Sequence, residues 1–374
     1  MIDFDFETNC YSCSACSNVC PVNAIHFNNK LHPMVDKCVC INCHKCEKVC
    51  VALNEPGLST RICGIEGLLC NNIDDNIRIK SSSGGVFYEL AKYFIKKEGY
   101  VCGCIYSDNL MPIHIVSNEI SQVKRMRGSK YVKSDMGFCI EQIRKLINGG
   151  KQVLFTGVPC QIAGVKKILG EHENLTLVAI ACHGSIERDI WGEYLKENVH
   201  GKVVEVTMRD KTRGWLNYGL KIKYDDGSVD LSYRYEDGRF LKCFTRGAFE
   251  RPVCLNCKYK GENINADIIL ADGWGVKELA PELEDGKGTS SVICVTQKGH
   301  SLYQKLSCHF VAKIVPIDVI TNHNKRIIFP AEKTHARKVF NGLYNGKNLN
   351  YAMERTCEKP SLFVRIINRL LKII

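Results

Sequence analysis

The sequence lacks any apolar run of about 18 residues, the stretch that indicates a membrane-spanning helix. Its first residues, 1–6, are acidic where a secretory signal would be basic and then apolar, and segments of low complexity are absent. These absences argue against an integral membrane protein and against a secreted disulfide scaffold. We therefore expect a cytoplasmic protein.

Cysteine, by contrast, is in excess. The 374 residues include 22 cysteines in an otherwise ordinary globular composition, with 45% hydrophobic and 24% charged residues. In a reducing compartment such a density indicates metal ligands rather than disulfides.

A repeat of cysteines occupies the first 58 residues. Its two halves are Cys10, Cys13, Cys16 and Cys20, then Cys40, Cys43, Cys46 and Cys50. Each half has the spacing C-x2-C-x2-C-x3-C, which is that of bacterial iron–sulfur ferredoxins. A zinc ribbon would instead separate two C-x2-C pairs by a dozen or more residues, so we expect iron–sulfur clusters.

Over about the first 55 residues the sequence resembles two-[4Fe–4S] bacterial-type ferredoxins. The resemblance implies two sets of cluster ligands, which are Cys10, Cys13, Cys16 and Cys50, and then Cys40, Cys43, Cys46 and Cys20. Val51 stands where such runs usually have proline, and Cys38 is expected to be a spare thiol.

After a turn-rich stretch at 53–59, predicted strands alternate with predicted helices. The expected helices are 86–97, 137–147, 161–169 and 186–198. The expected strands are 100–106, 112–117, 152–155, 175–181, 203–208, 218–224, 228–233, 266–271 and 291–296. The pattern predicts an α+β chain, in which a small two-cluster domain is followed by a mixed α/β domain.

Six segments match another family in the right order. They are 83–86, 128–131, 156–161, 182–184, 254–257 and 266–275. Over about 75–330 the chain resembles the beta subunit of the deazaflavin (F-420)-reducing hydrogenase and its relatives, which include deazaflavin-linked dehydrogenase subunits and the plant 7-hydroxymethyl chlorophyll a reductase. The resemblance implies bound FAD and a further [4Fe–4S] cluster close to it. We expect domains at 1–58 and 75–330, and a helical extension at 331–374.

The expected flavin contacts fall in three of these segments. Ser83, Gly84 and Gly85 precede a predicted helix, whose free N–H groups could seat a phosphate, although the same residues are ordinary helix caps. Gly128, Ser129, Lys130 and Tyr131 lie in a basic stretch, where Lys130 could neutralise a diphosphate or be simple surface charge. Gly157, Pro159 and Gln161 complete the set. No G-x-G-x-x-G follows a strand, so a Rossmann fold is not supported.

A second metal site is expected on Cys160, Cys182, Cys254 and Cys257, which lie at strand ends and in a loop. A third [4Fe–4S] cluster would bind there, and the alternatives are zinc or buried structural thiols. The remaining cysteines, such as Cys102 and Cys104, are expected to be small buried apolar residues.

Three aromatic residues near these segments have two interpretations each. Trp215 and Trp274 could pack on a flavin or fill the core, and His183 could donate a proton or hydrogen-bond to its own strand. No catalytic residue is assigned.

These parts predict an iron–sulfur flavoprotein oxidoreductase. Electrons would pass from the ferredoxin-type clusters through the inner cluster and FAD to a two-electron acceptor, either the deazaflavin coenzyme or another small organic substrate. The alternative is an electron-transfer subunit without its own substrate, serving a partner enzyme, for example in surface-polysaccharide synthesis. Either way we expect an electron-donor or acceptor protein as a partner.

Nucleic acid is not an expected partner. The formal net charge is +11, from 51 basic and 40 acidic residues. Each cluster with its four thiolates adds about −2, so three clusters would leave about +5. The segment 361–374 forms a basic amphipathic pattern, which either docks on its own core or makes peripheral contact with a membrane.

Overall fold

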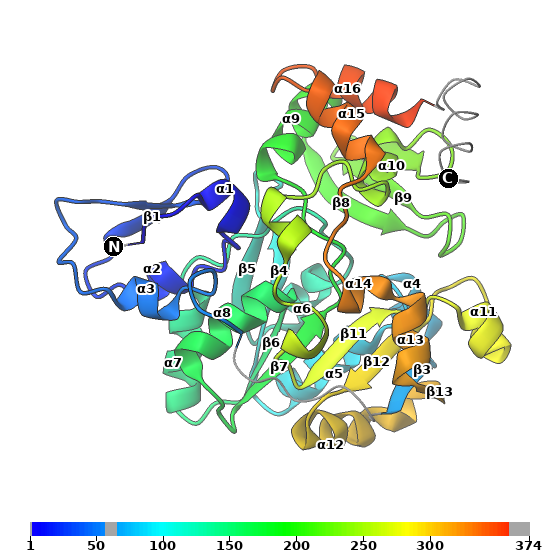
Figure 1. Cartoon of the computed structure of the whole chain (residues 1–374). Helices are drawn as coiled ribbons and strands as arrows, with labels where there is room; N and C mark the ends of the chain where they lie inside the picture. Colours follow the sequence, from blue (N-terminus) through cyan, green and yellow to red (C-terminus); the bar gives the residue numbers. More distant parts are fainter. Residues whose placement is uncertain (1, 57–65, 359–374) are drawn as a thin grey trace, which may run out of the picture.

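The computed structural model describes residues 2–56 and 66–358. The segment expected to be helical at 361–374, the end of the turn-rich stretch at 53–59, and Cys63 lie outside the described residues. The N-terminal lobe, blue in Figure 1, is built from short elements. They are α1 (Phe6–Asn9), α2 (Ala15–Asn18), β1 (Ile25–Phe27), β2 (Pro33–Val35) and α3 (Lys45–Val49), with β1 and β2 paired antiparallel.

The main body is organised by one mixed sheet of eight strands, in the order β13-β3-β12-β11-β7-β6-β4-β5. Its parallel centre consists of β4 (Tyr100–Tyr106), β6 (Val153–Gly157), β7 (Leu175–Ile180) and β11 (Ile268–Asp272). The flanking antiparallel strands are β5 (Pro112–Ser117), β12 (Ser290–Cys294), β3 (Glu66–Asn72) and β13 (Phe310–Pro316).

Helices cover both faces of this sheet, because successive residues of the central strands point to opposite sides. Val153 and Phe155 belong to one core and Leu154 to the other. The first core is covered by α7 (Cys139–Asn148), α8 (Pro159–Leu169) and α13 (Ile317–His323). The second is covered by α5 (Val86–Lys96), α6 (Ile120–Met126) and α12 (Gln297–Leu306). Short connecting helices are α4 (Asp75–Ile79), α11 (Val276–Leu279) and α14 (Lys325–Ile328).

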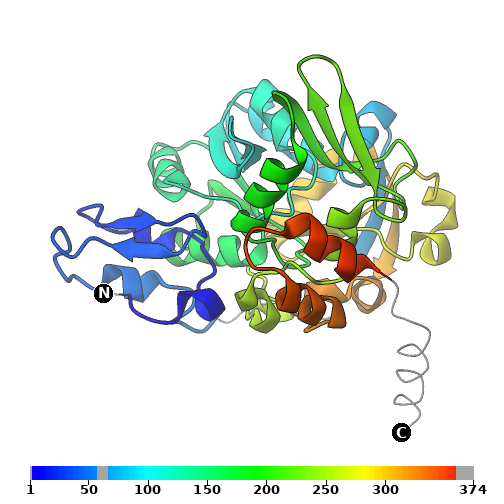
Figure 2. The same cartoon turned by 90° about the horizontal axis from the view of Figure 1, so that it is seen from above.

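A third lobe lies above the main sheet in Figure 1. Its antiparallel sheet consists of β8 (Val203–Asp210), β9 (Gly219–Tyr224) and β10 (Val229–Tyr233). Its helices are α9 (Arg188–Asn198), α10 (Arg239–Thr245), α15 (His335–Leu343) and α16 (Leu349–Cys357). Their apolar faces meet around the buried rings of Trp191 and Phe240. Seen from above in Figure 2, the N-terminal lobe projects to one side of the main body.

The α+β class and the mixed sheet are confirmed, and the expected helices and strands lie within a few residues of those observed. Four further strands, β1, β2, β3 and β13, were not among those expected. β3 lies between β12 and β13, which are more than 200 residues away in sequence. Its place is set by this distant pairing, which no local pattern reveals.

Candidate functional site

A cavity of about 720 Å³ opens at the carboxyl ends of the parallel strands β6, β7 and β11. Ligands of open α/β sheets bind at this end of the strands, because the loops that follow them converge there. All the expected flavin-binding residues line this cavity except Gly84 and Pro159. The three segments that the sequence motifs singled out are therefore brought to one place by the fold.

Gly84 has a packing role. A Cβ atom there would lie 2.3 Å from the Cys70 carbonyl oxygen and 2.7 Å from the Ser290 backbone nitrogen, so no side chain fits between β3 and β12. Gly85 precedes α5 with a φ of +90°, which favours glycine. The hydroxyls of Ser82 and Ser129, 2.9 Å apart, join this loop to the segment 128–131.

Lys130 lies in the cavity wall, but its ammonium is already engaged. It donates to the backbone carbonyls of Arg125 and Arg127, at 2.9 and 2.8 Å, at the end of α6. Burial lowers the pKa of Lys130 to about 8. In this arrangement the ammonium satisfies carbonyls that the helix leaves unpaired, and the proposed contact with a diphosphate would have to compete with them.

The opposite wall holds a buried guanidinium that sequence reasoning missed. Arg209 donates to Asp272 at 2.5 Å and lies over the ring of Tyr218, 4.4 Å from its centroid. Burial opposes its charge, but Asp272 raises the pKa of Arg209 above its usual range. Its Nε and Nη2 atoms are buried and have no hydrogen-bond partner in the described part of the chain. Two donors in a cavity wall with no acceptor fit an anionic or carbonyl-bearing ligand.

The two tryptophans stack on each other, with ring centroids 4.9 Å apart and planes 16° from parallel. Trp274 lines the large cavity, whereas Trp215 is buried behind it. Trp215 therefore fills the core, and Trp274 is the one of the pair that could contact a bound ring.

Charge in the large cavity is strongly positive. Its lining includes the seven basic residues Arg127, Lys130, Lys133, Arg209, Arg234, Lys325 and Arg326. It includes only two acids, Asp272 and Glu332, so the balance is 7 − 2 = +5. Such a cavity favours a ligand with several negative charges.

A smaller cavity adjoins the large one and is lined by all four cysteines of the expected inner site. Cys160 lies in the first turn of α8 and Cys182 just beyond the end of β7. Cys254 lies in a 3-10 turn, Pro252–Asn256, which Cys257 follows. Burial raises the pKa of Cys254 to about 11 and that of Cys257 to about 12. These thiols keep their protons at neutral pH unless a bound cation displaces them.

The spacing of these cysteines bears on the choice between zinc and a cluster. Among residues 2–56 and 66–358, no three His, Cys, Asp or Glu side chains are close enough to hold a single metal ion. A tetrahedral zinc site with Zn–S bonds of about 2.3 Å needs sulfurs about 3.8 Å apart. This spacing argues against a single zinc ion at the four cysteines, and a third cluster there stays a prediction, since a cubane holds its thiolates on separate iron atoms and therefore farther apart.

The walls of the four-cysteine cavity carry positive charge only. Lys133, Arg251 and Lys260 line it, and none of its lining residues is acidic. Lys260 donates to the carbonyls of Cys182 and Arg326, at 2.5 and 2.6 Å. Cations around four half-buried cysteines fit a group whose total charge, with its thiolates, is about −2.

In the N-terminal lobe the two halves of the cysteine repeat have the same backbone conformation at equivalent positions. Ser12 and Asn42 have φ of 48° and 50°, and Ser14 and His44 both have 57°. These left-handed turns let one short segment present several sulfurs from different directions. Burial raises the pKa of Cys13 to about 12, and the neighbouring thiols of Cys10 and Cys50 act in the same direction.

The ligand sets of the two N-terminal clusters stay predictions. Cys10, Cys13, Cys16 and Cys50 lie within electrostatic range of one another. Cys20 and Cys46 pack with Cys16 and Cys50 in the small core of the lobe. The Ala24 amide donates to the Cys20 sulfur at 3.3 Å.

In Figure 1 the N-terminal lobe lies beside α8, and the side chains of Tyr11 and Cys13 belong to the same apolar cluster as Cys160, Cys254 and Cys257. A Cβ atom on Gly164 of α8 would lie 2.9 Å from the Cβ of Cys13. Tyr11 and Tyr259 meet edge to face with centroids 5.1 Å apart, and the Tyr259 hydroxyl donates to the Val51 carbonyl at 2.6 Å. One apolar cluster therefore joins the N-terminal lobe to the inner cysteines.

His183 lines the large cavity next to Cys182. Its Nδ1 lies 3.2 Å from a carboxylate oxygen of Glu250, a fully buried side chain that the sequence did not single out. The ring also lies 5.3 Å from that of Phe244. The structure thus pairs His183 with a distant carboxylate and shows no Nδ1 hydrogen bond to its own strand.

The prediction that the remaining cysteines are buried is wrong in part. Cys70, Cys102, Cys139, Cys243 and Cys294 are buried, whereas Cys308 is exposed and Cys104 and Cys357 are half-buried. Cys308 lies in a short surface turn, and Cys104 lines the large cavity. Burial here depends on what covers each strand or turn, which the tertiary structure decides.

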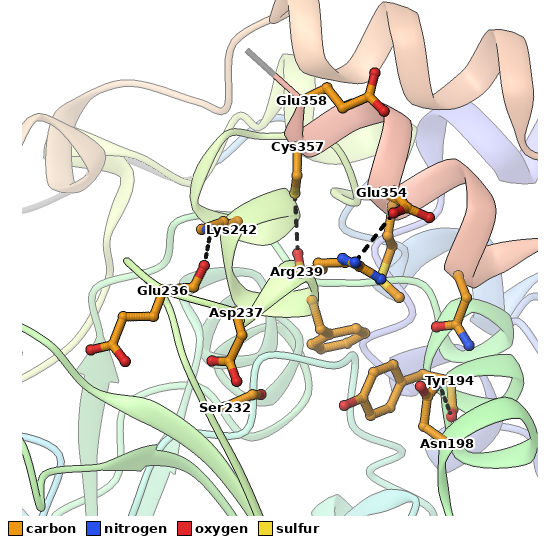
Figure 3. Close-up of a pocket in the computed structure, with 13 residues that line it drawn as sticks. Tyr194, Asn198, Ser232, Glu236, Asp237, Arg239, Lys242, Glu354, Cys357 and Glu358 are labelled. Atoms are coloured by element: carbon orange, nitrogen blue, oxygen red, sulfur yellow. Dashed lines mark hydrogen bonds and ion pairs between the residues drawn. The ribbon is translucent and has the colours of Figure 1, made fainter.

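A further cavity of about 550 Å³, shown in Figure 3, lies between α9, α10 and α16. It contains none of the residues predicted from sequence. Arg239 forms an ion pair with Glu354 at 3.2 Å, and the Cys357 sulfur lies 3.5 Å from that of Cys243. The contact with Cys243 and the nearby Arg246 lower the pKa of Cys357 to about 7.

In the described part of the chain, no helix combines the length and the apolar character needed to cross a bilayer. Peripheral membrane contact was expected only from the segment 361–374, which lies outside the described residues.

In a comparison with known protein families, one segment of the chain matches a family model. Residues 150–319 match the family described as the C terminus of the beta subunit of coenzyme F420 hydrogenase/dehydrogenase. For that segment the match confirms the resemblance that the sequence motifs indicated. A chain of the F420-reducing [NiFe] hydrogenase complex from Methanosarcina barkeri is similar at 18% identity, with a TM-score of 0.48, over 73% of this chain and 91% of that chain. No curated protein matches.

Proposed function

Because residues 150–319 match the beta-subunit family of coenzyme F420 hydrogenases and dehydrogenases, we propose that the chain is an iron–sulfur flavoprotein oxidoreductase. It would take single electrons from a redox partner protein through two ferredoxin-type clusters. An inner cluster on Cys160, Cys182, Cys254 and Cys257 would relay them to FAD in the large cavity. The acceptor would be the deazaflavin coenzyme or another small organic molecule, and the reducing cytoplasm is the compartment that suits these thiols.

The observation that carries this proposal is the linear order of three sites. The first cysteine group of the N-terminal lobe abuts the four-cysteine cavity across α8, and that cavity shares wall residues with the large cavity. The shared wall consists of Lys133, Val158, Cys182, Gly184 and Ser185. Sites in contact one after another are what stepwise electron transfer requires.

The residues of the large cavity fit a flavin dinucleotide and an anionic substrate. When bound, FAD would supply the conversion between one-electron and two-electron chemistry. The chain's own contribution is the +5 balance of lining charge, the free donors of Arg209, and the amide groups at the start of α5. Trp274 would limit the space beside a bound ring.

Iron, sulfide and flavin analysis of the anaerobically purified full chain tests the proposal. We expect about 12 Fe per chain, one non-covalent FAD, and a broad absorption near about 400 nm that bleaches on reduction. Replacing Cys254 by Ala should lower the iron content to about 8, with both N-terminal clusters retained. The full chain is the right sample, since removal of residues 1–58 would expose the apolar contacts of Tyr259 and α8.

Turnover separates the enzyme from a pure electron-transfer protein. With a chemical reductant and the deazaflavin coenzyme or another acceptor, reoxidation without any partner protein supports the enzyme. Clusters that become reduced but discharge to none of the small acceptors support the electron-transfer role. A colourless protein with one zinc and no iron would contradict both.

A further inference from the structure

The four-cysteine cavity and the large cavity are separated by a buried lysine. Lys133 lines both cavities, and only 3% of its surface is exposed. Its backbone is held on both sides, because its amide donates to the Ile186 carbonyl at 3.0 Å and its carbonyl accepts from Arg188 at 3.3 Å. The side chain is therefore held in the wall between the two sites.

The ammonium of Lys133 has an unusual partner. Its Nζ lies 3.8 Å from the sulfur of Cys160, and none of the residues that line the four-cysteine cavity is acidic. The other two basic side chains of this cavity, Lys260 and Arg251, have oxygen atoms as hydrogen-bond partners. Lys260 donates to backbone carbonyls, and Arg251 reaches Glu187 at 3.4 Å and the Cys10 carbonyl at 3.3 Å.

A buried ammonium with no anion beside it is costly, since charges leave water only when they are paired. A cysteine that ligates a cluster is a thiolate, and the cluster with its four thiolates carries about −2. That group would supply the anion that Lys133 lacks. The charge and its N–H···S contact would stabilise the reduced cluster, which is more negative by one unit, more than the oxidised one.

We propose that Lys133 sets the reduction potential of the inner cluster and, from its place in the shared wall, favours delivery of electrons to that cluster. This inference rests on the proposed function, since it requires a cluster on Cys160 and its three partners. Lys133 is a positioning residue: it touches a ligand of the cluster and need not touch the substrate.

A redox titration of the full chain tests this role. The spectra of the reduced clusters are followed as the potential is lowered, and the signal lost in Cys254→Ala identifies the inner cluster. In Lys133→Met its reduction should become at least about tenfold less favourable, a midpoint shift of about 59 mV to lower potential for one electron. Lys133→Arg should keep the wild-type midpoint, because the charge remains. The N-terminal clusters serve as an internal reference whose midpoints stay unchanged.

A matched control removes an equal charge elsewhere. Lys130 lines only the large cavity, and its ammonium caps the carbonyls of α6, so Lys130→Met should shift the inner cluster much less. If Lys133→Met does not retain about 12 Fe, Lys133→Gln is titrated in its place, since it loses the charge and keeps an N–H donor. Loss of the inner cluster in both neutral variants, with Lys133→Arg intact, also supports a role of the charge.

The proposal is overturned if a neutral variant retains about 12 Fe and the wild-type midpoint, or if Lys133→Arg behaves as Lys133→Met does. A wild-type chain with about 8 Fe that Cys254→Ala does not lower is a different failure. It removes the inner cluster and the proposed function, whereas an unchanged midpoint removes only the role of Lys133.

Discussion

The N-terminal lobe is attached to the main body partly by one asparagine, and this attachment can be measured. Asn18 is 7% exposed and makes two hydrogen bonds to the start of α7. Its amide donates to the Gly137 carbonyl at 2.7 Å, and its carbonyl accepts from the Glu141 amide at 3.0 Å. Phe138, which precedes α7, offers no side-chain cap, so the lobe supplies the cap for a helix of another domain.

Replacing Asn18 by Ala removes both contacts. Loss of a cap costs about 1 kcal/mol, and loss of an ordinary hydrogen bond costs about 1 kcal/mol more. The sum of about 2 kcal/mol corresponds to about a 30-fold change in the local opening equilibrium. Asn18→Asp is the matched variant, since it keeps an acceptor and adds a favourable charge at the helix start, while losing the donor to Gly137. It should fall between Ala and wild type.

Hydrogen exchange followed by mass spectrometry on peptides covering 138–143 measures this effect in the holoprotein. We expect the start of α7 to exchange up to about 30-fold faster in Asn18→Ala, while peptides from the third lobe stay unchanged. Equal uptake in wild type and Asn18→Ala at 138–143 would refute the reasoning. A uniform rise over the whole chain would also refute it, because it would mean global rather than local destabilisation.

Three other perturbations have defined outcomes. Gly164→Val should lower the melting temperature and slow reduction of the inner cluster by the N-terminal clusters, because the valine side chain would push the N-terminal lobe away from α8. Gly342→Ala is the control and should leave both quantities unchanged, because no atom lies within 4 Å of the added Cβ. Equal effects of the two substitutions would contradict this explanation. Cys357 has a pKa of about 7, below the ordinary thiol value, so its alkylation by iodoacetamide should rise as the pH increases through about 7. Cys243→Ala removes the hydrogen-bond donor to Cys357 and should move that rise to higher pH. A wild-type rise only near the ordinary thiol value would count against the contact. Arg209→Met should lower the free energy of unfolding in urea by up to about 3 kcal/mol, because the half-buried carboxylate of Asp272 loses its cation, and an unchanged midpoint would rule this out.

The prediction of iron–sulfur chemistry comes from the sequence alone, because it depends on local spacing. The repeat of Cys10–Cys20 at Cys40–Cys50 predicts iron–sulfur ligands, since neighbouring thiolates must reach one cluster from a short segment. Alternating and helical apolar patterns predicted most central strands and their covering helices, because an element that buries one face has apolar residues at regular intervals in its sequence. The motif segments likewise indicated where the walls of the large cavity come from.

Other features were decided only by tertiary contacts. β3 and β13 join the sheet through partners distant in sequence. β3 is buried on both faces and β13 is mostly exposed, so neither shows the alternation of apolar and polar residues that marks a half-buried strand. Lys130 looked like a phosphate ligand, yet its ammonium turns to the carbonyls of α6. Arg209 and Lys133 looked like ordinary basic residues. Each lies in the wall of a cavity with its charge buried beside a partner from another element, and the environment of a buried charge is a property of the whole fold.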